Sequence, residues 1–74
     1  MNEFLSKFAD QFDETDPKDI TIQTEFHDLD EWSSLTGLAV LNMISLNYGV
    51  KISPAELRNT TTVEALFNLV QSKK

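Results

Sequence analysis

Residues 29–35 read Leu-Asp-Glu-Trp-Ser-Ser-Leu, and they lead into fifteen residues, Ser34–Tyr48, without a charged side chain. A serine at the start of an apolar helix commonly caps it by accepting a hydrogen bond from a free backbone N–H. Ser33 is the better candidate for this cap, which places Ser34 at the first helical position with its hydroxyl toward solvent. That is the positive end of the helix dipole, where a phosphate is stabilised. The stretch therefore predicts a helix over residues 34–48 with an exposed serine at its start.

The predicted helix 34–48 carries two apolar stripes. The stripe assigned to the core comprises Gly37, Leu41, Ile44 and Tyr48, with Val40 beside it. The second stripe repeats the same spacing on another face and comprises Leu35, Ala39, Asn42 and Leu46, with Met43 nearby. A helix that is apolar on nearly all sides is either buried completely or presents a patch to a partner. Complete burial is hard to arrange in a domain this small, so we expect the second stripe to bind a partner.

The N-terminal segment predicts an amphipathic helix over Asn2–Glu14. Its apolar face comprises Phe4, Leu5, Phe8 and Phe12. Three phenylalanines spaced every four residues are typical of a core face, so we assign them to packing and not to ligand binding. The pair Asp16-Pro17 is predicted to end this helix, because the residue before a proline is pushed out of the α region.

Two more helices are predicted after Gly49, a glycine suited to the left-handed residue that ends helix 34–48. An extended connector, residues 50–52, leads to Ser53-Pro54-Ala55-Glu56, a capping box with proline at the first helical position, which predicts a short helix Pro54–Arg58. Thr61 or Thr62 then caps a last helix. Its apolar stripe is Val63, Leu66, Phe67 and Val70, and Lys73 and Lys74 lie at its negative end.

Residues 15–32 show no periodic pattern and predict a long first loop. Four apolar residues are expected to tie it to the core: Ile20, Ile22, Phe26 and Leu29. The carboxylates of Asp28, Asp30 and Glu31 could suggest calcium, but the glycine and the terminal glutamate of an EF-hand loop are missing, so no metal site is predicted. No stretch shows the alternation of a strand. The sequence predicts an all-α fold, a small four-helix bundle with three main helices and a short third one.

Two aromatic residues of this loop have structural explanations. His27 has no cysteine or second histidine with which to bind a metal, so we expect it to be exposed or to cap a helix. Trp32 precedes the cap of helix 34–48 and is expected to act as a hydrophobic staple that packs near Thr36. A direct contact between Trp32 and a partner is the alternative.

Charge is distributed unevenly along the chain, whose net charge is −6. Ten acidic residues against Lys7 and Lys18 give residues 1–31 a net charge of −8, whereas residues 32–74 carry +2. An acidic half of this kind would repel the phosphates of nucleic acid and favours basic protein partners. The same charge could equally serve solubility alone.

Length and composition indicate one domain, residues 1–74. The chain has no cysteine, which excludes disulfides and thiolate metal sites. No apolar run approaches the roughly 20 residues that span a bilayer, so no membrane partner is expected. Met1–Asp10 lacks the basic start and apolar stretch of a signal peptide. We therefore expect a cytoplasmic protein and a monomer.

The motif Ser34-Leu35, followed by Tyr48-Gly49-Val50-Lys51-Ile52, resembles an acyl carrier protein. That family carries an Asp-Ser-Leu motif and a glycine fifteen residues after its serine, which is the separation of Ser34 and Gly49. The similarity continues through Thr62–Leu66 and covers essentially all 74 residues. Two positions depart from the family: Ser33 stands where it usually has Asp, and Leu29 lies five residues before Ser34, where commoner members have four.

The resemblance implies a 4'-phosphopantetheine arm attached covalently to Ser34, on which acyl groups are held as thioesters. The partners that it implies are a phosphopantetheinyl transferase and acyl-transferring, ketosynthase-type or acyl-activating enzymes of fatty acid, polyketide or specialised biosynthesis. Family members commonly present acidic residues along the helix after the serine. In this chain that helix has none, so partner contact is expected from Leu35, Ala39, Asn42 and Leu46, with steering by Asp28, Asp30 and Glu31.

Catalysis by the chain alone is not expected. There is no cysteine nucleophile, a single histidine, no glycine-rich phosphate loop and no cluster of metal ligands. Ser34 and His27 could be a nucleophile and a base, but their spacing supplies no orienting acid and no oxyanion site. The alternative to a carrier is a non-catalytic helical interaction domain that docks a partner through Leu35, Ala39 and Leu46, with Ser34 merely exposed.

Overall fold

The computed structural model describes residues 2–74 and is helical, as the sequence predicts. Its elements in chain order are α1 (Asn2–Ala9), two short 3₁₀ turns (Pro17–Asp19 and Phe26–Asp28), α2 (Ser34–Tyr48), α3 (Pro54–Arg58) and α4 (Val63–Ser72). The described residues form no strand, and the one isolated β-bridge pairs Glu25 with Thr62. Four helices, the third of them short, confirm the predicted fold class.

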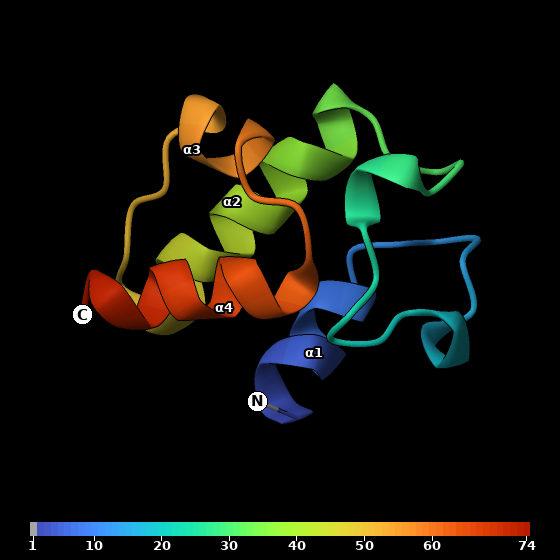
Figure 1. The fold of residues 1–74 in the computed structure, drawn as a ribbon, viewed down its shortest axis with the longest axis horizontal. Coiled ribbons are helices and arrows are strands. Elements are labelled where there is room, and N and C mark those ends of the chain that lie inside the picture. The colour runs from blue at the N-terminus through green and yellow to red at the C-terminus, as the bar shows by residue number, and fades with distance from the viewer. Residues whose placement is uncertain (1) are drawn as a thin grey trace.

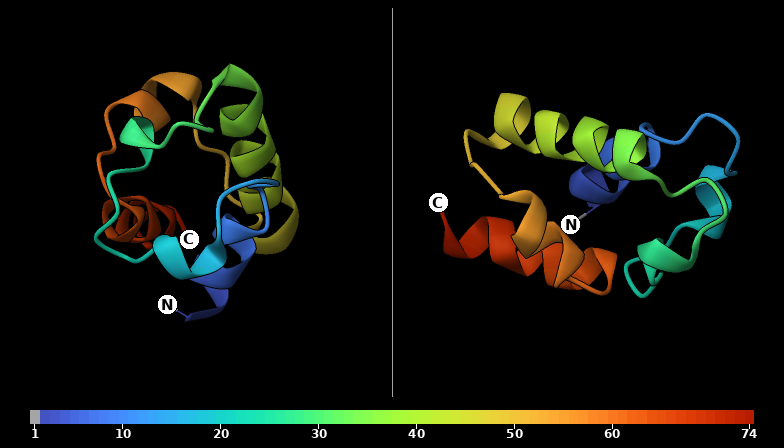
Figure 2. Two further views of the ribbon diagram at one scale, coloured as in Figure 1. Left: turned by 90° about the vertical axis from the view of Figure 1, so that its right-hand side faces the viewer. Right: turned by 90° about the horizontal axis from the view of Figure 1, so that it is seen from above.

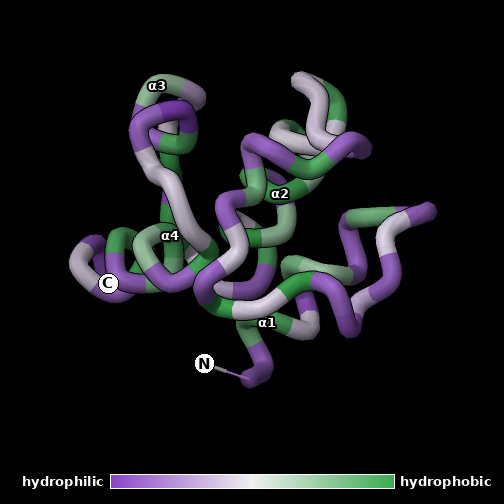
Figure 3. The backbone as a smooth tube through the Cα atoms, turned by 45° about the vertical axis from the view of Figure 1, so that its right-hand side comes forward, coloured by the Kyte–Doolittle hydropathy of each residue, from purple (hydrophilic) through white to green (hydrophobic). Residues whose placement is uncertain are grey.

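The helices enclose a core beside a long first loop (Figure 1). In the end-on view of Figure 2, α2 and α4 lie on opposite sides, with α3 on one side between them and α1 on the other. The second view of Figure 2 shows that α2 and α4 run in the same general direction, away from the first loop. Figure 3 shows α2 mostly apolar along its length, while strongly hydrophilic stretches lie in the first loop, at α3 and near the chain ends.

Helix α1 is shorter than predicted, because it ends at Ala9 and not at Glu14. After Asp10 the turn tightens, and the N–H groups of Gln11 and Phe12 reach back three residues, to the carbonyls of Phe8 and Ala9. The next three N–H groups leave the helical pattern altogether and donate to the carboxylate of Glu31. The proline signal was also assigned wrongly, since Asp16-Pro17 begins a 3₁₀ turn in which the Asp16 carboxylate accepts from the Lys18 N–H at 2.9 Å.

Aromatic rings join the first loop to α1 in the core. Phe4 and Phe8 of α1 and Phe12 after it are buried, which confirms their predicted place in the core, and Leu5 of the same predicted face is half-buried. The ring of Phe26 lies 5.4 Å from that of Phe8 and 4.8 Å from that of Trp32, measured between centroids. Of the other predicted ties, Ile20 is buried and Ile22 and Leu29 are half-buried, so the loop follows the core surface as expected.

The first loop also contacts the start of α4, which the sequence did not indicate. The carbonyls of Ile22 and Thr24 accept hydrogen bonds from the N–H groups of Glu64 and Val63, at 2.9 and 3.3 Å. These N–H groups belong to the first turn of α4 and have no partner within their own helix. Thr62 caps the same helix by accepting from the Ala65 N–H, which decides between the two threonines considered from the sequence.

Helix α2 has the predicted bounds, and Gly49 ends it in the left-handed region with φ of 66°. Of the core stripe, Gly37, Val40 and Ile44 are buried and Leu41 and Tyr48 are half-buried. Met43 differs from its predicted place beside the outer stripe, because its side chain is buried in the core. The position of Met43 follows from the wide inner face of α2, which packs against α1 as well as α3.

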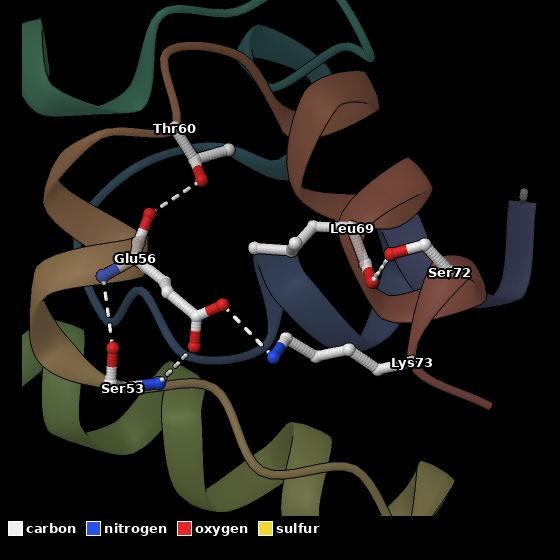
Figure 4. Close-up of polar contacts among 6 residues, drawn as sticks. All are labelled: Ser53, Glu56, Thr60, Leu69, Ser72 and Lys73. Carbon is white, nitrogen blue, oxygen red and sulfur yellow. Dashed lines mark hydrogen bonds and ion pairs between the residues drawn. The ribbon is translucent and has the colours of Figure 1, made fainter.

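Helix α3 is held at both ends by polar contacts (Figure 4). The predicted capping box is present: the Ser53 hydroxyl accepts from the Glu56 N–H, and the Glu56 carboxylate accepts from the Ser53 N–H. The other carboxylate oxygen pairs with the Lys73 ammonium at 2.9 Å, and this pair connects α3 to the end of α4. The backbone hydrogen bond from Ser53 and the contact with Lys73 hold the pKa of Glu56 below its usual 4.5.

Candidate functional site at the start of α2

Two adjacent serines at the start of α2 have different surroundings. Ser33 is the N-cap, with extended backbone angles, and its Oγ accepts from the Thr36 N–H at 3.3 Å. Its Oγ also lies 3.3 Å from Thr36 Oγ1. The only proton of the Thr36 hydroxyl goes to the carbonyl of Glu31, so the Ser33 hydroxyl is the donor in that contact. Ser33 is therefore engaged both as donor and as acceptor.

Ser34 is the first residue of α2 and is exposed, as predicted. Its hydroxyl makes no hydrogen bond with any other residue of the range 2–74. It stands at the positive end of a fifteen-residue helix, which stabilises an attached anion. Both serines are exposed, and Ser34 is the one whose hydroxyl has no hydrogen-bond partner within residues 2–74.

An apolar cleft of about 470 Å³ adjoins both serines. It is lined by Ser33, Ser34, His27, Trp32, Gly37, Leu38, Leu41, Pro54, Leu57 and Arg58. Gly37 lies on the α2 wall, where a Cβ would come within 3.4 Å of Leu57 and 3.5 Å of the Trp32 ring. The missing side chain therefore leaves space between α2 and α3 next to Ser34. No pattern in the sequence pointed to this cleft, because its walls come from the first loop, α2 and α3.

His27 and Trp32 form the wall of the cleft that the first loop supplies. His27 Nε2 lies 3.1 Å from the carbonyl of Leu57 and 2.9 Å from that of Thr60. Because both are acceptors, Nε2 carries the proton and caps the end of α3, so the capping role considered for His27 is confirmed. Trp32 takes the staple position, although it lies beside Gly37, one residue beyond the predicted neighbour Thr36.

The three carboxylates before α2 do not behave alike. Asp28 and Asp30 are exposed, whereas Glu31 is half-buried and accepts four hydrogen bonds. The donors are the N–H groups of Asp13, Glu14 and Thr15 and the hydroxyl of Thr15. Desolvation raises the pKa of Glu31, but these hydrogen bonds outweigh it and leave the pKa below the usual 4.5. Little of this carboxylate is left for a partner.

The outward side of α2 exposes large apolar side chains. Leu35 and Leu46 of the predicted stripe are 77% and 76% exposed, Asn42 is exposed and Ala39 is half-buried. Leu38, which the predicted stripe did not include, is 58% exposed and also lines the cleft. The predicted stripe follows steps of four, three and four residues from Leu35, and this series passes over Leu38. Leu38 nevertheless lies on the same side of the helix, because it is three residues from Leu35 and four from Asn42. We call Leu35, Leu38, Ala39, Asn42 and Leu46 the α2 surface.

Within residues 2–74, no group of His, Cys, Asp or Glu side chains is placed to hold a metal ion. None of the helices in that range has the length and apolar character to cross a membrane.

The fold and the site together define a class, the small helical carrier domain with an exposed serine at the start of its second helix. The chain belongs to the family described as phosphopantetheine attachment site, whose model matches residues 2–70. That family is defined by 4'-phosphopantetheine attached covalently to a serine. Neither the curated proteins nor the solved structures gave a match.

Proposed function

We propose that this chain is a non-catalytic acyl carrier protein with phosphopantetheine attached to Ser34. The observation that carries the proposal is the free, exposed hydroxyl of Ser34 at the first position of α2, beside an apolar cleft. The neighbouring Ser33 is occupied by its contacts with Thr36, which favours Ser34 as the attachment residue. The family match over residues 2–70 supports the cofactor.

The residues present fit the arm. An attached phosphate would lie at the positive end of α2 and in contact with solvent. The arm supplies the thiol that this cysteine-free chain lacks, and with it the capacity to hold acyl groups as thioesters. The protein's own part is to present the arm on a small rigid scaffold and to be recognised by partner enzymes.

The lining of the cleft supports an acyl cargo. Leu38, Leu41 and Leu57 contribute aliphatic walls beside Ser34, and Trp32 contributes an aromatic one. Apolar walls favour a hydrocarbon group over a polar one, since burial of apolar surface is the main favourable term in such a site. Fatty acid, polyketide and specialised surface-molecule pathways all use cargo of this kind, and we propose one of them as the setting.

Partner enzymes, in this proposal, dock on the α2 surface. A phosphopantetheinyl transferase and the acyl-handling enzymes must all reach Ser34. The exposed Leu35 and Leu38 lie within a turn or so of it on α2, and the exposed Leu46 lies near the other end of the helix. Asp28 and Asp30 remain available to steer a basic partner, because their carboxylates are exposed. Glu31, the third carboxylate of the expected steering group, is less suited to direct contact with a partner, because its oxygens already accept hydrogen bonds within the chain.

Labelling with coenzyme A and a phosphopantetheinyl transferase tests the proposal. Intact mass should show one added phosphopantetheine in the wild type and in Ser33→Ala, and none in Ser34→Ala. Ser33→Ala is the matched control, because it removes an adjacent hydroxyl and keeps Ser34. A mass gain in Ser34→Ala together with its loss in Ser33→Ala would place the attachment one residue earlier.

The second candidate function is a helical interaction domain without a cofactor. Its support is the exposure of three large apolar side chains on one side of α2, Leu35, Leu38 and Leu46, since exposed apolar patches often mark protein–protein contacts. The same labelling experiment separates the two functions, because only a carrier gains the phosphopantetheine mass.

A further inference from the structure

Glu31 connects two parts of the chain that meet at the attachment site. Its carboxylate accepts from the N–H groups of Asp13, Glu14 and Thr15, at 2.6, 3.0 and 2.8 Å, and from the Thr15 hydroxyl at 2.7 Å. Its backbone carbonyl accepts from the Thr36 hydroxyl at 3.1 Å, inside the first turn of α2. One residue therefore joins residues 13–15, which follow α1, to the start of α2.

These contacts have the form of an anion held by consecutive backbone N–H groups. Hydrogen bonds to a carboxylate are roughly twice as strong as those between neutral groups. They also bind three consecutive N–H groups of the chain after α1, those of Asp13, Glu14 and Thr15, and so hold this segment beside the start of α2. Glu31 thus determines where the first loop meets the helix that carries Ser34.

We propose that Glu31 is the positioning residue of the attachment site. It acts through the backbone and Thr36, and it fixes the first turn of α2 in the place from which Ser34 is presented to the transferase. This inference rests on the proposed attachment to Ser34. It assigns to Glu31 a role inside the molecule in place of the steering role that its charge and position suggest.

Variants that separate position from charge test this role. Glu31→Gln removes the charge and one strong acceptor, whereas Thr15→Val removes only the hydroxyl that donates to Glu31 and leaves every charge in place. Asp30→Asn is the control for charge alone. Asp30 is the adjacent exposed carboxylate and makes no hydrogen bond through its side chain within residues 2–74, so this variant can lose only charge steering, and any loss of rate in it should disappear at high salt.

The measurement is the rate of phosphopantetheine transfer at a temperature at which circular dichroism shows every variant fully folded. Glu31→Gln should lower kcat/KM by about tenfold. A shift of about 1 Å in the position of a reacting group, here the Ser34 hydroxyl, can lower a reaction rate by that factor or more. Thr15→Val should lower it in the same direction, and the double variant should lose less than the product of the two single losses. The loss should not change with salt. In hydrogen exchange, the N–H groups of residues 13–15 should be less protected in Glu31→Gln than in the wild type. Their protection should be unchanged in Asp30→Asn.

Other results would overturn the role. If Thr15→Val is silent and the loss in Glu31→Gln disappears at high salt, as it would in Asp30→Asn, then Glu31 steers the transferase by charge. If the variants melt earlier but are modified at the wild-type rate while folded, Glu31 only stabilises the fold. If the wild type is modified and every variant is modified at the same rate, this inference is refuted and the proposed function stands. If the wild type itself gains no phosphopantetheine, the proposed function is refuted as well.

Discussion

Ser33 replaces the aspartate that usually precedes the serine in acyl carrier proteins, and its contacts show how the cap is kept. Its hydroxyl accepts from the Thr36 N–H, as an aspartate would, and donates to the Thr36 hydroxyl, which an ionised aspartate could not do. What the replacement removes is a negative charge at the positive end of α2. The hydrogen-bonded cap is thus retained while the charge is lost.

Ser33→Asp should therefore keep the cap and add charge stabilisation of about 0.3–1 kcal/mol. Urea unfolding should show equal or slightly higher stability than the wild type. A general-purpose transferase that recognises the carboxylate should also modify the variant faster. Equal modification rates for the two proteins would show that the transferase does not use that carboxylate.

The elements show which signals in a sequence act locally. The bounds of α2 and α3 were predicted correctly, because Ser33, Gly49 and the Ser53–Glu56 box act within one turn of the helix ends. The end of α1 was not, because the acceptor that binds the N–H groups of residues 13–15 outside any helix is Glu31, far along the chain. Ser34 was placed correctly at the start of α2, but the cleft beside it needs walls from separate segments and had no local signal.

The α2 surface leads to a prediction about docking. Apolar contacts at the centre of an interface determine how long a complex lasts, whereas charges at its rim act mainly on the association rate. Leu46→Glu should therefore weaken binding to a cognate acyl-handling enzyme by about tenfold or more, and by more than Asp28→Asn and Asp30→Asn combined. Between low and physiological salt, the Kd of the wild type should change by less than about threefold.

Asn68→Glu is the control for this docking experiment, because it places the same charge on an exposed position of α4. It should leave the affinity unchanged. Titration calorimetry or surface plasmon resonance gives the affinities. If affinity collapses with salt while Leu46→Glu is silent, the acidic loop and not α2 is the docking face.

Across the whole molecule, two carboxylates tie together segments that are distant in the sequence. Glu31 joins residues 13–15, which follow α1, to the start of α2, and Glu56 joins α3 to the end of α4. The capping role of Glu56 could be predicted from its spacing to Ser53, but its pairing with Lys73 and the role of Glu31 depend on the tertiary arrangement. Contacts of this kind cannot be predicted from the local sequence, because their two partners come together only in the folded chain.

Acid should weaken both connections. The pKa of each carboxyl lies below the usual 4.5 in the folded protein, so the stabilisation is present above the unfolded value and is lost as pH falls through the folded one. The free energy of unfolding, measured with urea, should therefore fall below about pH 4.5. Glu31→Gln/Glu56→Gln should be less stable than the wild type at pH 7 and should lose less on acidification. Glu25→Gln, which changes a glutamate without a side-chain hydrogen bond in residues 2–74, should follow the wild type.

Mass analysis of the protein isolated from its own host tests the central claim most directly. Peptide mapping should place phosphopantetheine on Ser34, and treatment with hydroxylamine should release an acyl group whose mass identifies the cargo. Ser33 should be unmodified in the same peptide. A chain that carries no phosphopantetheine in its host, under conditions in which the pathway is active, would contradict the claim that it works as an acyl carrier.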